Sequence, residues 1–292
     1  MCFKSKLVRR SSLTLGLILW ISNNFAIPHY YCTSADSNFF KKVVRLVNDI
    51  NRYDAEFVEK ILIFDLGFTP AQRQLLAKSP HVYLREVEKV CPEILDLFLT
   101  SHGPPRPRWV RGWFAWKPVV IKQALDECPY IFYIDAAIEI YKPLDDLFKH
   151  IVAQGYFLIS TETSTIRSRI TNSVKEQLLP KLSSELQDSL LNSDIILISA
   201  GVQGLSRAVY DNYVLPVYNL AQNFELFKDD GSAKLGFGAG RHDQIIYTIF
   251  AYQNNFQIYH NGWMDLKVNG KTAPLYAHWN RKELNAQSAF KY

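Results

Sequence analysis

Short, mainly apolar runs alternate with stretches of helical periodicity along most of this chain. Runs such as "VEKILIFDL" (58–66) and "YIFYIDAAIEI" (130–140) are typical of strands that are buried on both faces of a sheet. Strands that alternate with helices predict an α/β sandwich, with a mostly parallel central sheet flanked by helices. The pattern predicts strands at 29–34, 58–66, 81–87, 130–140, 194–200 and 256–260, and helices at 37–52, from Thr69, at 117–128, near 173–191, from about Leu205 and at 242–255.

Local signals mark several boundaries between these elements. Thr69, Pro70 and Gln72 form a helix start, with a threonine cap, proline at the first position and glutamine completing a capping box. The prolines and glycines of 101–113 exclude regular structure and predict a loop. Residues 160–169 are polar and rich in serine and threonine, and 229–240 is rich in glycine, so we expect a mobile surface segment and a flexible loop there.

The N-terminus has the layout of a secretory signal. Basic residues come first, an apolar stretch follows at 13–21, and "SNNFA" then offers a cleavage site after Ala26. The apolar stretch is shorter than the roughly 20 residues of a bilayer-spanning helix, which favours a cleaved signal peptide over a short membrane anchor. We expect residues 1–26 to be this signal, 27–292 to form a single domain, and the protein to enter the secretory route or be exported, with membrane association through the N-terminus as the alternative.

Composition is that of a soluble globular protein, with 48% hydrophobic and 21% charged residues. The net charge of +5 arises mostly in the signal, which holds four of the 33 basic residues and no acid, so 29 bases face 28 acids in the remainder. A nearly balanced chain offers no basic face for nucleic acid.

The four cysteines show no C-x-x-C spacing, so they indicate no zinc cluster. Signal cleavage would remove Cys2 and leave Cys32, Cys91 and Cys128. Three buried thiols, or one disulfide and a free thiol, are both compatible with that number.

The stretch "FYIDAAIEIYKPLDDLF" (132–148) carries the first candidate chemistry. Asp135 ends an apolar strand, and ligands of open α/β sheets bind at the carboxyl ends of strands. Many sugar-transferring enzymes end such a strand with two acids, spaced D-x-D, that hold a metal. Here Ala137 stands at the second position. The residues alone therefore leave open a metal site with one carboxylate, a site without chemistry and an ordinary strand end.

The surrounding sequence resembles the glycosyltransferases of the GT-A fold, and especially the glycogenin-like family 8 enzymes. In those enzymes a lysine or arginine opens a helix, the next strand ends in aspartates, and an apolar stretch then closes in an acidic "D-x-L-F" turn. Within "FAWKPVVIKQALDECPYIFYIDAAIEIYKPLDDLF", Lys117, Asp135 and "DDLF" (145–148) match those places.

Four further motifs extend the resemblance over roughly residues 30–280. "YCTSAD" (31–36) is similar to the first strand end of that fold, "ISAGVQGLSRA" (198–208) to its N-A-G-V turn, and "RHDQIIYTIF" (241–250) to a helix that begins with Asp-Gln. "LYAHWN" (275–280) is similar to the segment with a late metal-binding histidine. The string W-K-P, Y-I-D-A, A-G-V-Q-G and H-D-Q resembles an uncharacterised group of GT-A transferases.

The resemblance implies a transferase that uses a nucleotide-diphosphate sugar as donor and a glycan, lipid or protein hydroxyl as acceptor. Asp135 and His278 would then hold Mn²⁺ or Mg²⁺, which neutralises charge on the diphosphate. Its donor site would contain Thr33 and Ser34 near the nucleotide base, together with Lys117, Asp135 and Ala137. The resemblance further implies Gly201, Gln203 and Trp116 on the acceptor side, and Asp243, Gln244 and Lys117 as catalytic residues, with Asp243 the acid nearest the reacting carbon.

Simpler interpretations stand beside these roles. Lys117 and Asp243 also suit ordinary helix starts, and a histidine such as His278 is often just packed or at the surface. The aromatic cluster of Trp109, Trp113, Phe114 and Trp116 suits either stacking on sugar rings or core packing. Because Ala137 replaces an acid, a non-catalytic carbohydrate- or nucleotide-binding protein on the same fold is the alternative function.

Overall fold

The computed structural model describes residues 26–101, 108–260, 264–265 and 273–277. A six-stranded sheet forms its centre, in the order β3-β2-β1-β6-β9-β8. The first four strands of that order run parallel, and β9 is antiparallel to both β6 and β8. The sheet consists of β1 (His29–Ala35), β2 (Val58–Asp65), β3 (Val82–Glu86), β6 (Tyr130–Ile134), β8 (Tyr156–Thr165) and β9 (Ile196–Ser206).

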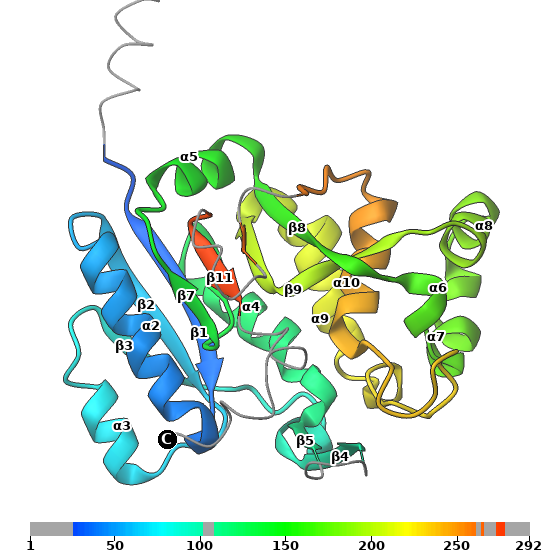
Figure 1. Ribbon diagram of the computed structural model, residues 1–292, viewed down its shortest axis with the longest axis horizontal. Helices are drawn as coiled ribbons and strands as arrows, with labels where there is room; N and C mark the ends of the chain where they lie inside the picture. Colours follow the sequence, from blue (N-terminus) through cyan, green and yellow to red (C-terminus); the bar gives the residue numbers. More distant parts are fainter. Residues whose placement is uncertain (1–25, 102–107, 261–263, 266–272, 278–292) are drawn as a thin grey trace, which may run out of the picture.

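Helices cover both faces of this sheet (Figure 1). Side chains that alternate along a strand point to opposite faces, so Tyr31 joins one hydrophobic cluster and Cys32 the other. On the first face lie α2 (Phe40–Tyr53) and α5 (Asp145–Gln154), and on the second lie α4 (Trp116–Glu127), α9 (Leu215–Leu220) and α10 (His242–Gln253). The sequence therefore predicted the α/β sandwich and its mostly parallel sheet correctly.

Smaller elements complete the chain. The shorter helices are α3 (Pro70–Leu76), α6 (Ile166–Arg169), α7 (Asn172–Gln177) and α8 (Ser184–Asn192), with 3-10 turns η1 (Ser37–Phe39), η2 (Pro92–Leu95), η3 (Gly112–Phe114), η4 (Leu179–Lys181), η5 (Arg207–Val209) and η7 (Phe224–Leu226) and a π-helical turn η6 (Tyr210–Val214). Two small sheets pair β4 (Leu97–Ser101) with β5 (Arg108–Arg111), and β10 (Met264–Asp265) with β11 (Leu275–Ala277) and β7 (Ile138–Ile140). The capping box predicted at Thr69 is present, with Thr69 and Gln72 exchanging hydrogen bonds.

Three sequence predictions were wrong, because strand pairing rather than local composition decides whether a segment becomes a strand. Within the predicted loop 101–113, Arg108–Arg111 forms β5 by pairing with β4. Within the predicted surface segment 160–169, β8 continues to Thr165 against β9, and α6 follows. The strand predicted at 256–260 is reduced to one bridge between Ile159 and Tyr259.

Three cysteines lie in the described part of the chain, and all of them are buried free thiols. Of the two cysteine arrangements compatible with the sequence, the structure therefore has three buried thiols. No helix in residues 26–101, 108–260, 264–265 or 273–277 is long and apolar enough to cross a membrane. The predicted signal sequence falls outside these residues, except for Ala26 at its end.

Candidate active site

The carboxyl ends of β1 and β6 lie side by side and bring the predicted donor residues together. These strands are parallel neighbours, with Cys32 opposite Tyr133, so Ser34, near the end of β1, and Asp135, just after β6, lie at the same edge of the sheet. The backbone N–H of Asp135 donates to the carbonyl oxygen of Gly201 at 2.9 Å, which ties this edge to β9. Sheet topology therefore places Ser34, Asp135 and Gly201 at one edge of the sheet.

Lys117 occupies the middle of this site. It lies in the first turn of α4, and its Nζ is 3.2 Å from Asp135 Oδ1 and 3.2 Å from Asp243 Oδ2. Lys117 is only 3% exposed and Asp243 4%, whereas the side chain of Asp135 is 27% exposed. We call Lys117, Asp135 and Asp243 the ion triad. It joins α4, the end of β6 and the first turn of α10.

The charges of the triad stabilise one another in a poorly solvated place. Burial lowers the pKa of the Lys117 ammonium, but Asp135 and Asp243 outweigh it and leave that pKa above its ordinary value. Burial also raises the pKa of Asp243 to about 6, although Lys117 acts in the opposite direction. Lys117 therefore stays charged at neutral pH, while Asp243 changes its protonation just below it.

Tyr133 is a site residue that the sequence reasoning missed. Its hydroxyl donates to Asp135 Oδ1 at 2.8 Å and lies 3.3 Å from Ser34 Oγ. Burial raises the pKa of Tyr133 well above its ordinary value, so the hydroxyl remains a donor. Period-two alternation was the available signal, because a residue two positions before Asp135 projects from the same side of the strand.

Donor-side candidates other than the triad have separate surroundings. Thr33 is 1% exposed, and its Oγ1 has no hydrogen-bond partner among the described residues. A buried hydroxyl without a partner at a strand end is a ready contact for a bound molecule. At Ala137, the backbone carbonyl accepts a hydrogen bond from Arg45 Nη2 at 3.1 Å. Arg45 thus holds the turn where a second acid stands in the D-x-D pattern.

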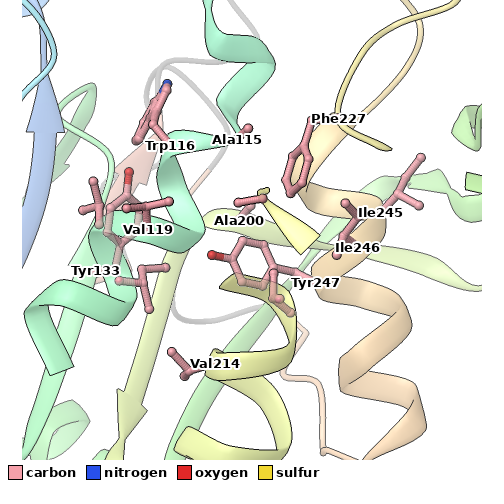
Figure 2. Close-up of a cluster of buried hydrophobic side chains, with 14 of the residues drawn as sticks. Ala115, Trp116, Val119, Tyr133, Ala200, Val214, Phe227, Ile245, Ile246 and Tyr247 are labelled. Carbon is pink, nitrogen blue, oxygen red and sulfur yellow. The ribbon is translucent and has the colours of Figure 1, made fainter. Parts of the chain in front are cut away.

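The acceptor-side candidates lie deeper than expected. Gln203 is fully buried on β9, where its side chain donates to the Ala200 carbonyl and accepts from the Tyr213 hydroxyl at 3.1 Å. Trp116 is 6% exposed, and its indole N–H donates to the Arg111 carbonyl at 3.0 Å. Figure 2 shows Trp116 and Tyr133 across the hydrophobic cluster from the side chains of α10.

Gln244 follows Asp243 and anchors the start of α10. The side-chain Nε2 of Gln244 donates to the backbone carbonyl of Ile198 on β9 at 3.3 Å. The backbone carbonyl of Gln244 accepts a hydrogen bond from Thr248 Oγ1 at 2.6 Å. These bonds fix the first turn of α10 against the sheet. Gln244 therefore helps to set the position of the Asp243 carboxylate.

The structure gives the predicted metal site one described ligand. The contacts of Asp135 with Lys117 and Tyr133 both use Oδ1, and the side chain is partly exposed, so its carboxylate can be approached by a cation. Among the residues that the structure describes, no three His, Cys, Asp or Glu side chains gather to hold a metal ion. His278 lies outside those residues. Asp135 therefore fits a metal only if a bound diphosphate or other residues supply most of the ligands.

Comparisons with known proteins identify the fold. No protein-family model and no curated protein matches the sequence. The structure is similar to apo mouse xyloside xylosyltransferase 1, with a TM-score of 0.53 and 12% identity over 87% of this chain and 99% of that one. It is also similar to an active-site mutant of the galactosyltransferase LgtC, with a TM-score of 0.50 and 10% identity over 84% of this chain and 85% of that one. The protein thus has the GT-A fold that its sequence predicted.

Proposed function

We propose that this protein is a glycosyltransferase that moves a sugar from a nucleotide-diphosphate donor to a hydroxyl acceptor. The observation that carries the proposal is the buried Lys117 ammonium, held at 3.2 Å from carboxylates of both Asp135 and Asp243. It lies at the edge of the sheet where open α/β folds bind their ligands. The likeness to two sugar transferases in fold supports the same reaction class.

Lys117 suits the departure of the nucleotide. When the bond between the sugar and the diphosphate breaks, negative charge develops on the leaving oxygen. A fixed cation in a water-poor site stabilises such charge more strongly than one in water, and it needs no reorganisation during the reaction. Lys117 is both buried and charged at neutral pH, so it meets both conditions.

Asp243 suits a proton transfer at the reacting centre. A positioned base works best when its pKa lies near the operating pH, and the pKa of Asp243 is raised to about 6. At pH 7 most Asp243 side chains are ionised and can accept a proton from an acceptor hydroxyl. Gln244 holds the helix start that presents this carboxylate.

The remaining candidates complete the proposed site. Thr33 and Ser34 contact the nucleotide at the end of β1, and Ala137 leaves room beside Asp135. The acceptor side is shaped by Gly201, Gln203 and Trp116. The side chains of Gln203 and Trp116 are buried, so they support this side of the site through packing. The acceptor would be a hydroxyl of a glycan, lipid or protein.

A divalent cation is part of the proposal. The triad carries two acids against one base, so a bound diphosphate adds negative charge to a site that already has a surplus. Asp135, with His278 from outside the described residues, would hold Mn²⁺ or Mg²⁺ beside the diphosphate. When bound, the cation would neutralise part of the negative charge of the diphosphate.

Release of nucleotide from a donor panel tests the proposal. We expect one or more nucleotide-diphosphate sugars to raise the melting temperature and to release nucleotide faster when a hydroxyl acceptor is present. A protein that binds nucleotide sugars but never releases nucleotide would support the alternative, a non-catalytic binding protein on this fold. Failure of every donor to bind or react would refute the transferase function and leave only a carbohydrate-binding protein as the alternative.

A further inference from the structure

Three bulky residues beside the ion triad have strained backbones. Gly112, Trp113 and Phe114 follow one another just before α4 with φ values of 50°, 45° and 65°, and His242 at the start of α10 has a φ of 33°. Left-handed backbone at a residue with a side chain costs about 1 kcal/mol or more, and such residues cluster at functional sites.

The strained residues are in contact with one another through their rings. The His242 ring centroid is 4.8 Å from that of Trp113 and 5.6 Å from that of Phe114. Phe237 packs edge-on against Trp113 at 6.2 Å. We call Trp113, Phe114, Phe237 and His242 the aromatic platform. Trp113 is its buried base, Phe114 and His242 are half-buried, and Phe237 is 46% exposed.

The platform leads from the ion triad to solvent. Lys117 Nζ lies 5.5 Å from the centre of the Phe114 ring, and His242 directly precedes Asp243. At the outer end, Phe237 belongs to the glycine-rich loop 229–240. The carboxylate of Asp229 holds that loop by accepting from the backbone N–H groups of Gly231 and Gly238. A molecule lying on the platform would thus have one end near the ion triad and the other at the surface.

His242 is held in one orientation on this platform. A backbone carbonyl can only accept, so the contact of 2.8 Å between His242 Nδ1 and the Phe227 carbonyl makes Nδ1 the donor. The bond fixes the plane of the imidazole relative to Phe114. The strained backbone and the fixed ring therefore act together to set an aromatic face beside the catalytic carboxylate.

We propose that the aromatic platform is the acceptor subsite and that the acceptor is a glycan whose pyranose ring stacks on it. The inference rests on the proposed glycosyltransferase function and names its acceptor class. The partly exposed rings of Phe114, Phe237 and His242 suit the C–H face of a sugar, and the nearby ion triad suits its hydroxyl edge. A lipid chain would instead need a continuous apolar groove, and the platform is interrupted by the polar imidazole of His242.

Sugar binding measured without turnover tests the inference directly. Methyl pyranosides of glucose, galactose and xylose are titrated into the full chain and followed by saturation-transfer NMR, with a short alkanol and a serine peptide as competing probes. We expect at least one pyranoside to bind, and Phe237→Ala and His242→Gly to weaken it by about 10-fold, the size of a lost aromatic contact of about 1.4 kcal/mol. Glycine adopts the positive φ of position 242 without strain, so His242→Gly removes the imidazole ring while the backbone can keep its conformation. Weaker binding in this variant is then due to the lost ring and not to unfolding.

Tyr83→Ala is the matched control, because Tyr83 is 43% exposed but lies on the distant edge strand β3. It should leave the affinity unchanged. Equal affinity in all variants, or binding of only the alkanol or the peptide, would overturn the inference. If nucleotide release is observed, the acceptor KM should rise more than the donor KM in Phe237→Ala. Pyranoside binding at the platform without any donor binding would refute the proposed function while leaving the subsite in place.

Discussion

At the scale of single residues, the site depends on an ammonium that two acids share. Neither acid is equivalent to the other, because Asp135 is partly exposed while Asp243 is almost fully buried. Exposure suits Asp135 for contact with a ligand or cation, and burial gives Asp243 a pKa close to neutral. The two carboxylates therefore have different chemistry although they contact the same lysine.

Removal of the Asp243 charge should affect turnover more than stability. We expect Asp243→Asn to lower the rate of nucleotide release by at least about 100-fold, the usual contribution of a positioned acid or base. The melting temperature should change little, because asparagine keeps the shape of the side chain, burial already acts against ionisation of Asp243, and Asp135 still pairs with Lys117. Steady-state kinetics and thermal unfolding of both proteins check this. A large loss of stability would mark Asp243 as a structural residue.

The pKa of Asp243 also predicts a pH dependence of stability. Its pKa is raised from 3.8 to about 6 on folding, so between these values the folded state keeps a proton that the unfolded state has lost. The contribution of Asp243 to the free energy of unfolding should therefore fall as pH rises through this window and stay level above it. Denaturant unfolding from pH 4 to 7.5 should show this fall in the wild type relative to Asp243→Asn. Parallel curves would contradict the raised pKa.

Asp135 should couple metal binding to donor binding. One carboxylate gives weak affinity for Mn²⁺ alone, and diphosphate oxygens add both ligands and charge, so each should tighten the other by the same factor. We expect calorimetry to show tighter nucleoside diphosphate binding with Mn²⁺ than with EDTA, and Asp135→Asn to abolish the difference. Equal affinities in wild type under both conditions would remove the metal role and leave Lys117 as the cation of the site.

At the scale of elements, the turn before α4 determines where Lys117 lies. A Cβ atom at Gly112 would be 1.9 Å from the Ile94 carbonyl oxygen, so no other residue fits without movement of η2 or η3. The sequence showed glycine and proline around this turn but not the left-handed backbone of Trp113 and Phe114. That conformation depends on contacts with Ile94 and His242, which are distant in sequence.

A comparison of Gly112→Ala with Gly236→Ala should distinguish the cost of steric crowding from the cost of backbone strain. Gly236→Ala introduces backbone strain alone, whereas Gly112→Ala introduces both. Both glycines have positive φ, 50° and 79°, but nothing lies within 4 Å of a Cβ at Gly236. We expect Gly236→Ala to cost about 1 kcal/mol of unfolding free energy, and Gly112→Ala to cost clearly more and to reduce activity. Chemical denaturation measures both. Similar losses would show that η3 shifts easily and does not fix Lys117.

Sequence reasoning was most accurate where one element decides the outcome. The capping box at Thr69, the strand that ends just before Asp135 and the helix with Asp243 in its first turn all have local signals. It failed at β5, which pairs with the neighbouring strand β4, and at the end of β8, which pairs with the distant strand β9. For the site, motif order located Lys117, Asp135 and Asp243, but only the sheet topology shows that one ammonium contacts both acids.

At the scale of the whole molecule, one prediction concerns the mature chain. The basic start and the short apolar stretch predict cleavage after Ala26, so the exported protein should begin near Ile27. This start would still leave β1 complete, because that strand begins at His29. N-terminal sequencing of exported protein checks the cleavage. An intact Met1 end that fractionates with membranes would indicate an anchor instead.

The chemistry proposed for the ion triad would become available only late in synthesis. A ribosome delivers α4 and β6 early, but α10, with Asp243, comes near the end of the described chain. Until then β9 lacks the helix that covers it, and a nascent chain with uncovered apolar residues such as Leu197 is a ligand for chaperones. Any truncation before α10 should therefore give a chain that is recognised as unfinished before it can bind a donor.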